Sequence, residues 1–225
     1  MTGNDQGFPV DFPWPPFSDE DYRQEAVVRA GGPLADRLAR VRLVVLDADG
    51  VLTSGHMIYG AQGEAFKEFH SRDGLGLVLA RAAGLKLAVL TGRQSDIVAR
   101  RCAELRFDVI KLGRFDKVDA LGEILAETGC RAGDTAYVGD DVIDLPAMFQ
   151  VGVPVAVPEA PQEVRHHSLY VTTARGGEGA VREVVDLVLK SAGLYGLALT
   201  RLRDRAWQPT RRELSSDHGR DPEPA

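Results

Sequence analysis

The 225-residue sequence has only two cysteines and no apolar run of the ~18–20 residues that a membrane-spanning helix needs. Cys102 and Cys130 stand in no metal-ligand spacing, so neither a disulfide framework nor a zinc site is predicted. With a net charge of −6 the chain offers no general attraction for nucleic acid or an anionic membrane, and we expect neither partner. The N-terminal segment is acidic and proline-rich rather than basic and then apolar, which favours a cytoplasmic protein without a secretory signal.

Lysine is also scarce, because only 5 of the 27 basic residues are lysines. A coding bias toward arginine is one explanation of the imbalance, and it would leave the remaining lysines at random positions. In a chain that nearly always uses arginine, each lysine is also a candidate for a chemical role. They are Lys67, Lys86, Lys111, Lys117 and Lys190.

Composition divides the chain into three parts. Residues 1–40 are interpreted as a proline- and aromatic-rich arm with a short helix, and the proline density predicts an extended backbone over residues 1–25. Residues 41–193 form the predicted domain. Residues 194–225 are polar, arginine-rich and without apolar periodicity toward their end, which predicts a mobile tail.

The central stretch alternates short apolar runs with segments of helical periodicity. Such alternation predicts an α/β fold with a Rossmann-like, doubly wound parallel sheet. A small β-hairpin, turned at Gly60 to Gly63, is predicted as an insertion after the first strand. The expected strands are 41–46, 85–90, 107–110, 135–138, 151–157 and 169–172, and the expected helices are 73–83, 94–105, 116–128, 142–149 and 178–191.

Carboxylates follow two of the predicted strands at the point where each strand ends. Asp47 and Asp49 follow the first strand, and Asp140, Asp141 and Asp144 follow the fourth. Ligands of doubly wound sheets bind beyond the carboxyl ends of the strands, so we expect these side chains to meet. Clustered carboxylates repel one another unless a cation neutralises them, and oxygen ligands without histidine or cysteine favour Mg²⁺.

An anion pocket is predicted at the same edge. Lys117 opens a predicted helix, where a cation opposes the helix dipole, and Thr91 follows the second strand. A helix N-terminus, an ammonium group and a hydroxyl together suit a phosphate group. Each short motif alone is common in turns, but their combination at successive strand ends indicates phosphoryl transfer.

These residues resemble a known family. Asp47-Ala-Asp-Gly-Val-Leu-Thr53, Thr91-Gly-Arg93, Lys117 and Gly139-Asp-Asp-x-x-Asp144 are similar to the four motifs of the haloacid dehalogenase-like (HAD) phosphatases. The segments 69–74, 137–146 and 176–183 resemble more narrowly the 3-deoxy-D-manno-octulosonate 8-phosphate (KDO 8-phosphate) phosphatases. The resemblance covers about residues 40–193 and implies a HAD-like phosphatase domain.

The resemblance implies a role for each matched residue. Asp47 would be the nucleophile, forming an aspartyl-phosphate, and Asp49 the general acid and base. Mg²⁺ would be held by Asp47, by the backbone carbonyl of Asp49 and by Asp140, with Asp141 and Asp144 supporting these ligands. Thr91 and Lys117 would bind the phosphate oxygens.

The sugar contacts implied by the resemblance lie at His70, Ser71, Arg72, Asp73, Gly74, Arg93 and Arg101. Arg72 and Arg93 suit the carboxylate of a sugar acid, because a guanidinium group can bind it through two hydrogen bonds. His70 stands where the family pattern has asparagine, which leaves the exact sugar open.

The spacing of the motifs leaves no room for a cap domain, since 43 residues separate Asp47 from Thr91 and 25 separate Thr91 from Lys117. A capless site takes a large substrate or borrows walls from another subunit. The resemblance implies a homotetramer in which the hairpins pair into a shared barrel.

The sequence therefore predicts a Mg²⁺-dependent phosphomonoesterase acting on a small-molecule sugar-acid phosphate, with KDO 8-phosphate as the first choice. One alternative keeps the mechanism and changes the substrate to a nonulosonate 9-phosphate. The other is a non-catalytic oligomerisation module of the same fold, which would not need Asp47, Asp49, Lys117 and Asp140 together.

Overall fold

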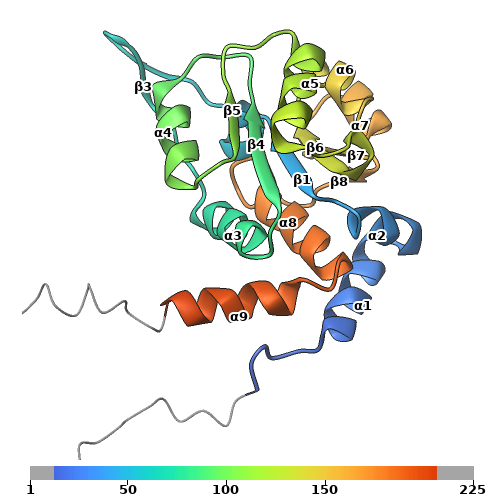
Figure 1. Ribbon diagram of the computed structural model, residues 1–225. Helices are drawn as coiled ribbons and strands as arrows, with labels where there is room; N and C mark the ends of the chain where they lie inside the picture. Colours follow the sequence, from blue (N-terminus) through green and yellow to red (C-terminus); the bar gives the residue numbers. More distant parts are fainter. Residues whose placement is uncertain (1–12, 207–225) are drawn as a thin grey trace, which may run out of the picture.

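A six-stranded parallel sheet forms the centre of the molecule in the computed structural model, which describes residues 13–206 (Figure 1). The strand order β5-β4-β1-β6-β7-β8 confirms the expected doubly wound α/β sheet. Its strands are β1 (Leu43–Leu46), β4 (Lys86–Leu90), β5 (Val109–Lys111), β6 (Thr135–Gly139), β7 (Val153–Ala156) and β8 (Tyr170–Val171).

Strand β1 lies in the middle of this sheet. All four of its residues are buried, as its apolar sequence predicts for a strand covered on both faces. It pairs in parallel with β4 on one side and β6 on the other, and Val45 is opposite both Ala88 and Tyr137. The chain segments that follow β1, β4 and β6 therefore leave the sheet at the same edge.

Helices cover both faces of the sheet (Figure 1). On one side lie α3 (Ser71–Ala82), α4 (Asp96–Glu104) and α8 (Ala180–Ser191), and on the other α5 (Lys117–Thr128), α6 (Leu145–Met148) and α7 (Gln162–His167). Ser95 caps the start of α4 by accepting the N–H of Val98, and Gly129 ends α5 in the left-handed conformation at φ 67°. Short helical turns at Ala48–Leu52, Ala132–Asp134 and Val142–Asp144 complete the connections.

The predicted hairpin is confirmed as β2 (Ile58–Gly60) and β3 (Gly63–Phe66), which pair in an antiparallel manner. It protrudes from the domain beside α4 (Figure 1). Within the described residues it is the insertion between β1 and α3, so the fold is capless as expected.

The N-terminal segment differs from its prediction. Residues 19–25 are not extended but belong to α1 (Asp19–Ala30), which is followed by α2 (Gly32–Leu38). Ser18 and Asp21 form a capping box that starts α1, and Tyr22 and Ala26, four residues apart, are buried on one face. The prolines precede this cap and therefore do not oppose the helix. Residues 1–12 of the predicted arm lie outside the described residues.

The prediction of a mobile tail from residue 194 is wrong for its first part, because α9 spans Tyr195–Ala206. Tyr195 and Ala198 are buried, and Leu199 and Leu202 pack against the core, so a narrow apolar stripe runs between the arginines. The remainder of the predicted tail, residues 207–225, lies outside the described residues. No helix among residues 13–206 combines the length and the apolar character needed to cross a lipid bilayer.

The first and last described helices meet at the end of α8. The rings of Tyr22 and Tyr195 pack edge to face with centroids 4.8 Å apart. The Arg23 guanidinium donates to the backbone carbonyl of Ser191 at 2.6 Å, and Lys190 forms an ion pair with Glu25 at 2.6 Å. Residues on both sides of the predicted domain thus pack onto it, whereas its predicted limits at 41 and 193 stay a prediction.

Candidate active site

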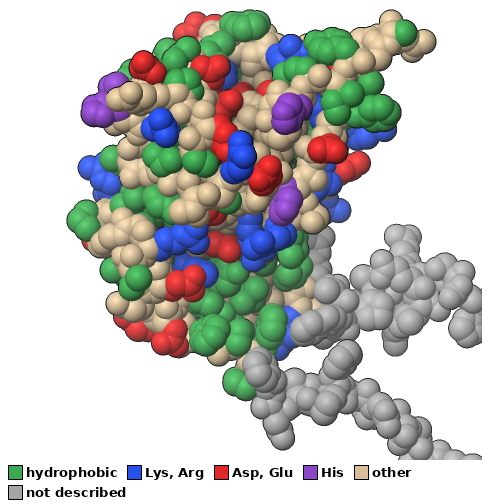
Figure 2. Space-filling model, turned by 180° about the vertical axis from the view of Figure 1, so that it is seen from behind, with side chains coloured by type: hydrophobic (Ala, Val, Ile, Leu, Met, Phe, Trp, Pro, Cys, Tyr) green, Lys and Arg blue, Asp and Glu red, His purple; other side chains and the backbone are tan. Residues whose placement is uncertain are grey.

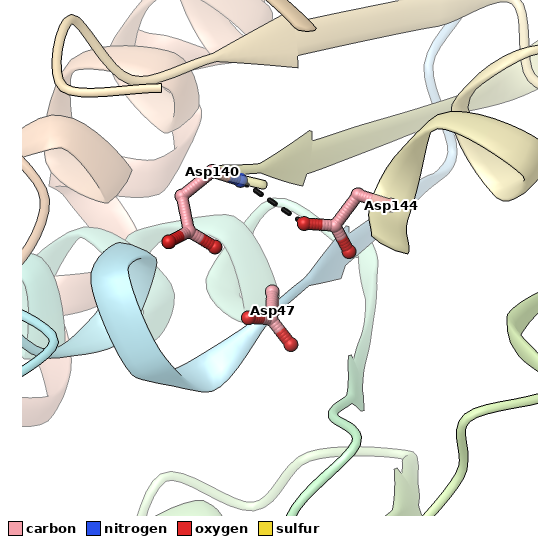
Figure 3. Close-up of side chains that lie close together, drawn as sticks. All are labelled: Asp47, Asp140 and Asp144. Atoms are coloured by element: carbon pink, nitrogen blue, oxygen red, sulfur yellow. Dashed lines mark hydrogen bonds between the residues drawn. The ribbon is translucent and has the colours of Figure 1, made fainter. Parts of the chain in front are cut away.

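Three carboxylates converge at the carboxyl ends of β1 and β6 (Figure 3). Asp47 follows β1, Asp140 follows β6, and Asp144 lies one helical turn further on. One oxygen of each lies within 4.8 Å of the others, and Figure 3 shows all three side chains directed toward one another. The parallel pairing of β1 with β6 therefore brings together residues that are 93 positions apart in the sequence.

Among residues 13–206, no basic side chain forms an ion pair with the Asp140 carboxylate, whereas Lys117 pairs with Asp47 and Asp144. Burial, followed by the charges of Asp47 and Asp144, raises the pKa of Asp140 to about 8. Burial also raises the pKa of Asp47 to about 6, although the neighbouring Lys117 ammonium opposes this shift. These shifts identify the cluster as a place where a cation would be stabilised.

The residues present fit a hard divalent cation. The donors are carboxylate oxygens without histidine or cysteine, the set that Mg²⁺ prefers. The turn after β1, Ala48–Leu52, approaches Asp140 so closely that a Cβ at Gly50, which has φ 93°, would lie 2.0 Å from the Oδ2 of Asp140. Only glycine leaves space there for the Asp140 carboxylate.

Asp144 is already saturated with hydrogen bonds. Its Oδ1 accepts from Lys117 Nζ at 2.5 Å and from the Tyr137 hydroxyl at 2.8 Å. Its Oδ2 accepts the backbone N–H groups of Asp140 at 3.1 Å and Asp141 at 3.3 Å. Because Asp144 is fully buried and both oxygens are occupied, this geometry suits a support for Lys117 and Asp140 better than a metal ligand. The carboxylate of Asp141 is exposed and caps the following turn at Val142.

Lys117 lies in the first turn of α5 with its side chain 1% exposed. Its Nζ is 3.0 Å from Asp47 Oδ1 as well as 2.5 Å from Asp144 Oδ1. Burial alone would lower the pKa of this ammonium, but the two carboxylates outweigh burial and raise it. A permanent positive charge is therefore held beside Asp47. Thr91 is buried at the carboxyl end of β4, the strand next to β1.

The Asp49 carboxylate lies outside the three-carboxylate cluster. Its Oδ1 contacts the Nζ of Lys67, and its Oδ2 is 3.6 Å from Nε of Arg93. Arg93 in turn donates to the Tyr59 hydroxyl at 2.7 Å, so the hairpin and the loop after β4 both reach Asp49. A contribution of Asp49 to metal binding through its backbone carbonyl stays a prediction.

Four of the predicted sugar contacts lie together. The residues His70, Asp73, Gly74 and Arg101 line one small cavity between the start of α3 and α4. The Arg101 guanidinium packs over the Phe69 ring, and a Cβ at Gly74 would lie 2.5 Å from its Nη2. Nδ1 of His70 and Nε of Arg101 are buried and have no hydrogen-bond partner among the described residues. Ser71 and Arg72 are exposed in the first turn of α3.

Asp73 lines this cavity as well, but its carboxylate also has partners on α8. It is 2% exposed, and its two oxygens accept the backbone N–H groups of Gly179 at 3.2 Å and Arg182 at 2.7 Å. Both oxygens are therefore used at the start of α8, where four N–H groups lack partners within the helix. Asp73 therefore joins α3 to α8, and its role as a sugar contact stays a prediction.

Known proteins match this chain over most of its domain. The model of the haloacid dehalogenase-like hydrolase family matches residues 108–184. The 3-deoxy-D-manno-octulosonate 8-phosphate phosphatase KdsC of Haemophilus influenzae is 41% identical over 160 residues, which are 71% of this chain and 89% of that protein. The chain belongs to the KDO 8-phosphate phosphatase family. The family member from Yersinia pestis is 40% identical over 176 residues, covering 75% of this chain and 94% of that protein.

Solved structures of KDO 8-phosphate phosphatases share the fold. The Moraxella catarrhalis enzyme, in complex with a magnesium ion, a phosphate ion and KDO, matches with a TM-score of 0.71 and 36% identity over 78% of this chain and 98% of that chain. The cobalt-bound Haemophilus influenzae enzyme matches with a TM-score of 0.69 and 42% identity over 71% of this chain and 93% of that chain. The chain is thus a HAD-like phosphatase in sequence and in fold.

Sequence reasoning missed two residues that touch the predicted site of this phosphatase. Tyr137, inside β6, hydrogen-bonds Asp144, and Lys67, after β3, contacts Asp49. The scarcity of lysine was a signal for Lys67, whose side chain is 1% exposed. No sequence pattern distinguishes Tyr137 from an ordinary core residue.

Proposed function

We propose that this phosphatase hydrolyses KDO 8-phosphate to KDO and inorganic phosphate in a Mg²⁺-dependent reaction. The observation that carries the proposal is the buried Asp47–Asp140–Asp144 cluster with Lys117 beside it. Support comes from the family, because the Moraxella catarrhalis relative binds magnesium, phosphate and KDO.

Two of the carboxylates would hold the metal. These are Asp47 and Asp140, because both oxygens of Asp144 already accept hydrogen bonds. The backbone carbonyl of Asp49 is the proposed third ligand. Bound Mg²⁺ supplies positive charge that neutralises the carboxylates and the phosphoryl oxygens. The rest of the chemistry belongs to residues of this chain.

In the proposed first step, a carboxylate oxygen of Asp47 attacks phosphorus and the bond from phosphorus to the sugar oxygen breaks. The Asp49 carboxyl group gives its proton to that sugar oxygen, and KDO leaves. Lys117 holds Oδ1 of Asp47 at 3.0 Å, which fixes the orientation of the attacking group. The product of this step is an aspartyl-phosphate on Asp47.

In the second step, the Asp49 carboxylate takes a proton from a water molecule whose oxygen attacks the same phosphorus. The bond between phosphorus and Asp47 breaks, so phosphate leaves and both aspartates return to their starting forms. Thr91 and Lys117 are the proposed donors to the phosphoryl oxygens in both steps, because charge accumulates there in the transition state.

The sugar would be held beside this centre. Arg72, Arg93 and Arg101 supply positive charge for the sugar-acid carboxylate, with His70, Ser71 and Gly74 beside them. Support comes from the buried nitrogens of His70 and Arg101 that have no hydrogen-bond partner among the described residues, because such groups are costly unless a ligand satisfies them.

We further propose a cytoplasmic homotetramer assembled through the hairpin. Met57, Ile58, Tyr59 and Phe66 on β2 and β3 or just before them are 38–68% exposed. Figure 2 shows the hairpin protruding at the upper right of the rear face with apolar side chains gathered near it. An isolated two-stranded ribbon with an apolar surface is marginally stable and tends to pair with another copy.

The test is an assay of phosphate release with the purified protein and a panel of sugar phosphates, with Mg²⁺ or with a chelator. We expect KDO 8-phosphate to give the highest kcat/KM and the chelator to abolish activity. Higher kcat/KM for a nonulosonate 9-phosphate would change the substrate and keep the mechanism. Absence of turnover on every ester, with Mg²⁺ present, would refute the proposal in favour of a non-catalytic module.

A further inference from the structure

Lys67 is buried although it leaves an exposed hairpin. Its side chain is 1% exposed, as is that of Lys117, whereas Lys86, Lys111 and Lys190 are 50%, 19% and 12% exposed. A buried ammonium loses its hydration, so its position is stable only if carboxylates replace the water. The partners of Lys67 therefore indicate the role of its buried position.

Two carboxylates face the Lys67 ammonium from different parts of the chain. Oε1 of Glu64, three residues earlier, lies 3.0 Å away, and Oδ1 of Asp49 also contacts Nζ. The second oxygen of Glu64 accepts from the Ser95 hydroxyl, which caps α4. A continuous series of polar contacts thus runs from the rigid start of α4 through Glu64 and Lys67 to Asp49.

This series leaves the Asp49 carboxylate little freedom. Lys67 holds Oδ1, while Nε of Arg93 lies 3.6 Å from Oδ2. Asp49 is 13% exposed, so the carboxylate is also screened from most competing water. An ion pair with Glu64, three residues away, would be enough to stabilise the hairpin locally. The additional contact of Lys67 with Asp49 is not required for that purpose.

We infer that Lys67 is a positioning residue that orients the Asp49 carboxyl group for proton transfer to the leaving oxygen of the substrate. The inference rests on the proposed phosphatase function. In the step concerned, the phosphorus–oxygen ester bond breaks and the Asp49 proton passes to the departing oxygen, while Lys67 keeps all its protons. Lys67 therefore acts through Asp49 and is not itself the acid.

A leaving-group comparison separates this role from general support of the fold. KDO 8-phosphate releases an alkoxide, which needs a proton, whereas p-nitrophenyl phosphate releases a stabilised phenolate that leaves without one. The second step, in which Asp49 acts as base, is common to both esters, but kcat/KM covers only the steps up to release of the leaving group. Loss of a well-placed general acid therefore lowers kcat/KM for KDO 8-phosphate and spares kcat/KM for p-nitrophenyl phosphate. A merely structural role would slow both reactions alike.

The variant Lys67→Met keeps the length of the side chain and removes its charge. We expect kcat/KM for KDO 8-phosphate to fall on the order of 10–100-fold, part of the usual contribution of a general acid, with kcat/KM for p-nitrophenyl phosphate changed by less than about 3-fold. Lys111→Met is the matched control, because Lys111 also pairs with two carboxylates, Glu123 and Glu127, at 2.7 Å on the surface. It should leave both reactions unchanged.

Glu64→Gln provides a second variant in case Lys67→Met does not fold, and it should give the same selective loss to a smaller extent. Equal losses on both esters, or no loss on KDO 8-phosphate, would overturn the role of Lys67. Wild-type protein that hydrolyses neither ester would instead refute the proposed function, so the two failures are distinguishable.

Discussion

Asp47 is the single residue on which the proposed chemistry depends, and Asp47→Asn tests it with the smallest change of shape. We expect kcat to fall at least ~1,000-fold, because a carboxamide does not attack phosphorus, while the buried residues of β1 keep the sheet intact. Phosphate release and a thermal melt of the same sample provide the measurement. Retention of a tenth of the wild-type activity would contradict the assignment of the nucleophile.

Arg72 is exposed in the first turn of α3 and is free to meet a sugar-acid carboxylate. Arg72→Ala should raise KM for KDO 8-phosphate by the equivalent of ~1.5–3 kcal/mol, which is usual for one charged hydrogen-bonding partner. Hydrolysis of p-nitrophenyl phosphate, which has no carboxylate, should barely change. Similar losses on both substrates would mean that Arg72 supports the structure instead of binding the sugar.

Asp140 makes the stability of the metal-free protein depend on pH. Burial and the neighbouring carboxylates raise its pKa to about 8, against about 4 in an unfolded chain, so between these values the folded state holds a proton that unfolding releases. The free energy of unfolding should therefore decrease as the pH rises from about 5 to about 8. Mg²⁺ competes with that proton and should stabilise the protein more at pH 8 than at pH 5.

Thermal melts in chelator and in Mg²⁺ at the two pH values measure this difference directly. If Mg²⁺ raised Tm equally at both, the carboxylate cluster would not be the place where it binds.

Most of the cluster was predictable from sequence, whereas the contacts of Lys67 and Asp73 were not. Asp47 and Asp140 stand at strand ends, and parallel strand pairing is enough to bring strand ends together. Lys67 and Asp73 depend on how the hairpin and α8 fold back, which no local pattern records. The resemblance alone assigned Asp73 to the sugar, and the structure shows that its oxygens accept N–H groups at the start of α8.

At the scale of helices, Asp73 fastens α3 to α8. Asp73→Ala would leave the buried N–H groups of Gly179 and Arg182 without an acceptor, and the free energy of unfolding should drop by ~1–3 kcal/mol. Denaturant titration measures the loss. Arg72→Ala, one residue earlier and exposed, is the control and should change stability by less than ~0.5 kcal/mol. An Asp73→Ala protein with the same free energy of unfolding as the wild type would show that α8 does not need this acceptor.

The helices and strands of the sheet domain were predicted well because their periodicity is strong, and both ends of the described chain were predicted less well. In α9, arginines interrupt a stripe of which only Tyr195 and Ala198 are fully buried. In α1, the prolines before Ser18 dominated the interpretation. Helix α1 packs mainly on α8, and α9 packs mainly on α3. Short helices of this kind are stabilised by such tertiary contacts more than by their own sequences, and these contacts are invisible in a local window.

At the scale of the whole molecule, the proposed tetramer is tested by light scattering. The expected mass is about four times 24.4 kDa. Phe66→Lys, on the exposed hairpin, should reduce the mass, whereas Val28→Lys, an equally exposed apolar residue on α1, should not. A wild-type monomer with full activity would remove the proposal that the hairpins assemble the site.

The contacts of α1 with the end of α8 also set an order of events during synthesis. Arg23 and its acceptor Ser191 are 168 residues apart, an interval that a ribosome covers in roughly 10–30 s at about 5–20 residues per second. A helix of 12 residues is marginal by itself, so α1 gains this packing surface only after α8 has been made. Among the described helices, the first to be made thus depends on one of the last.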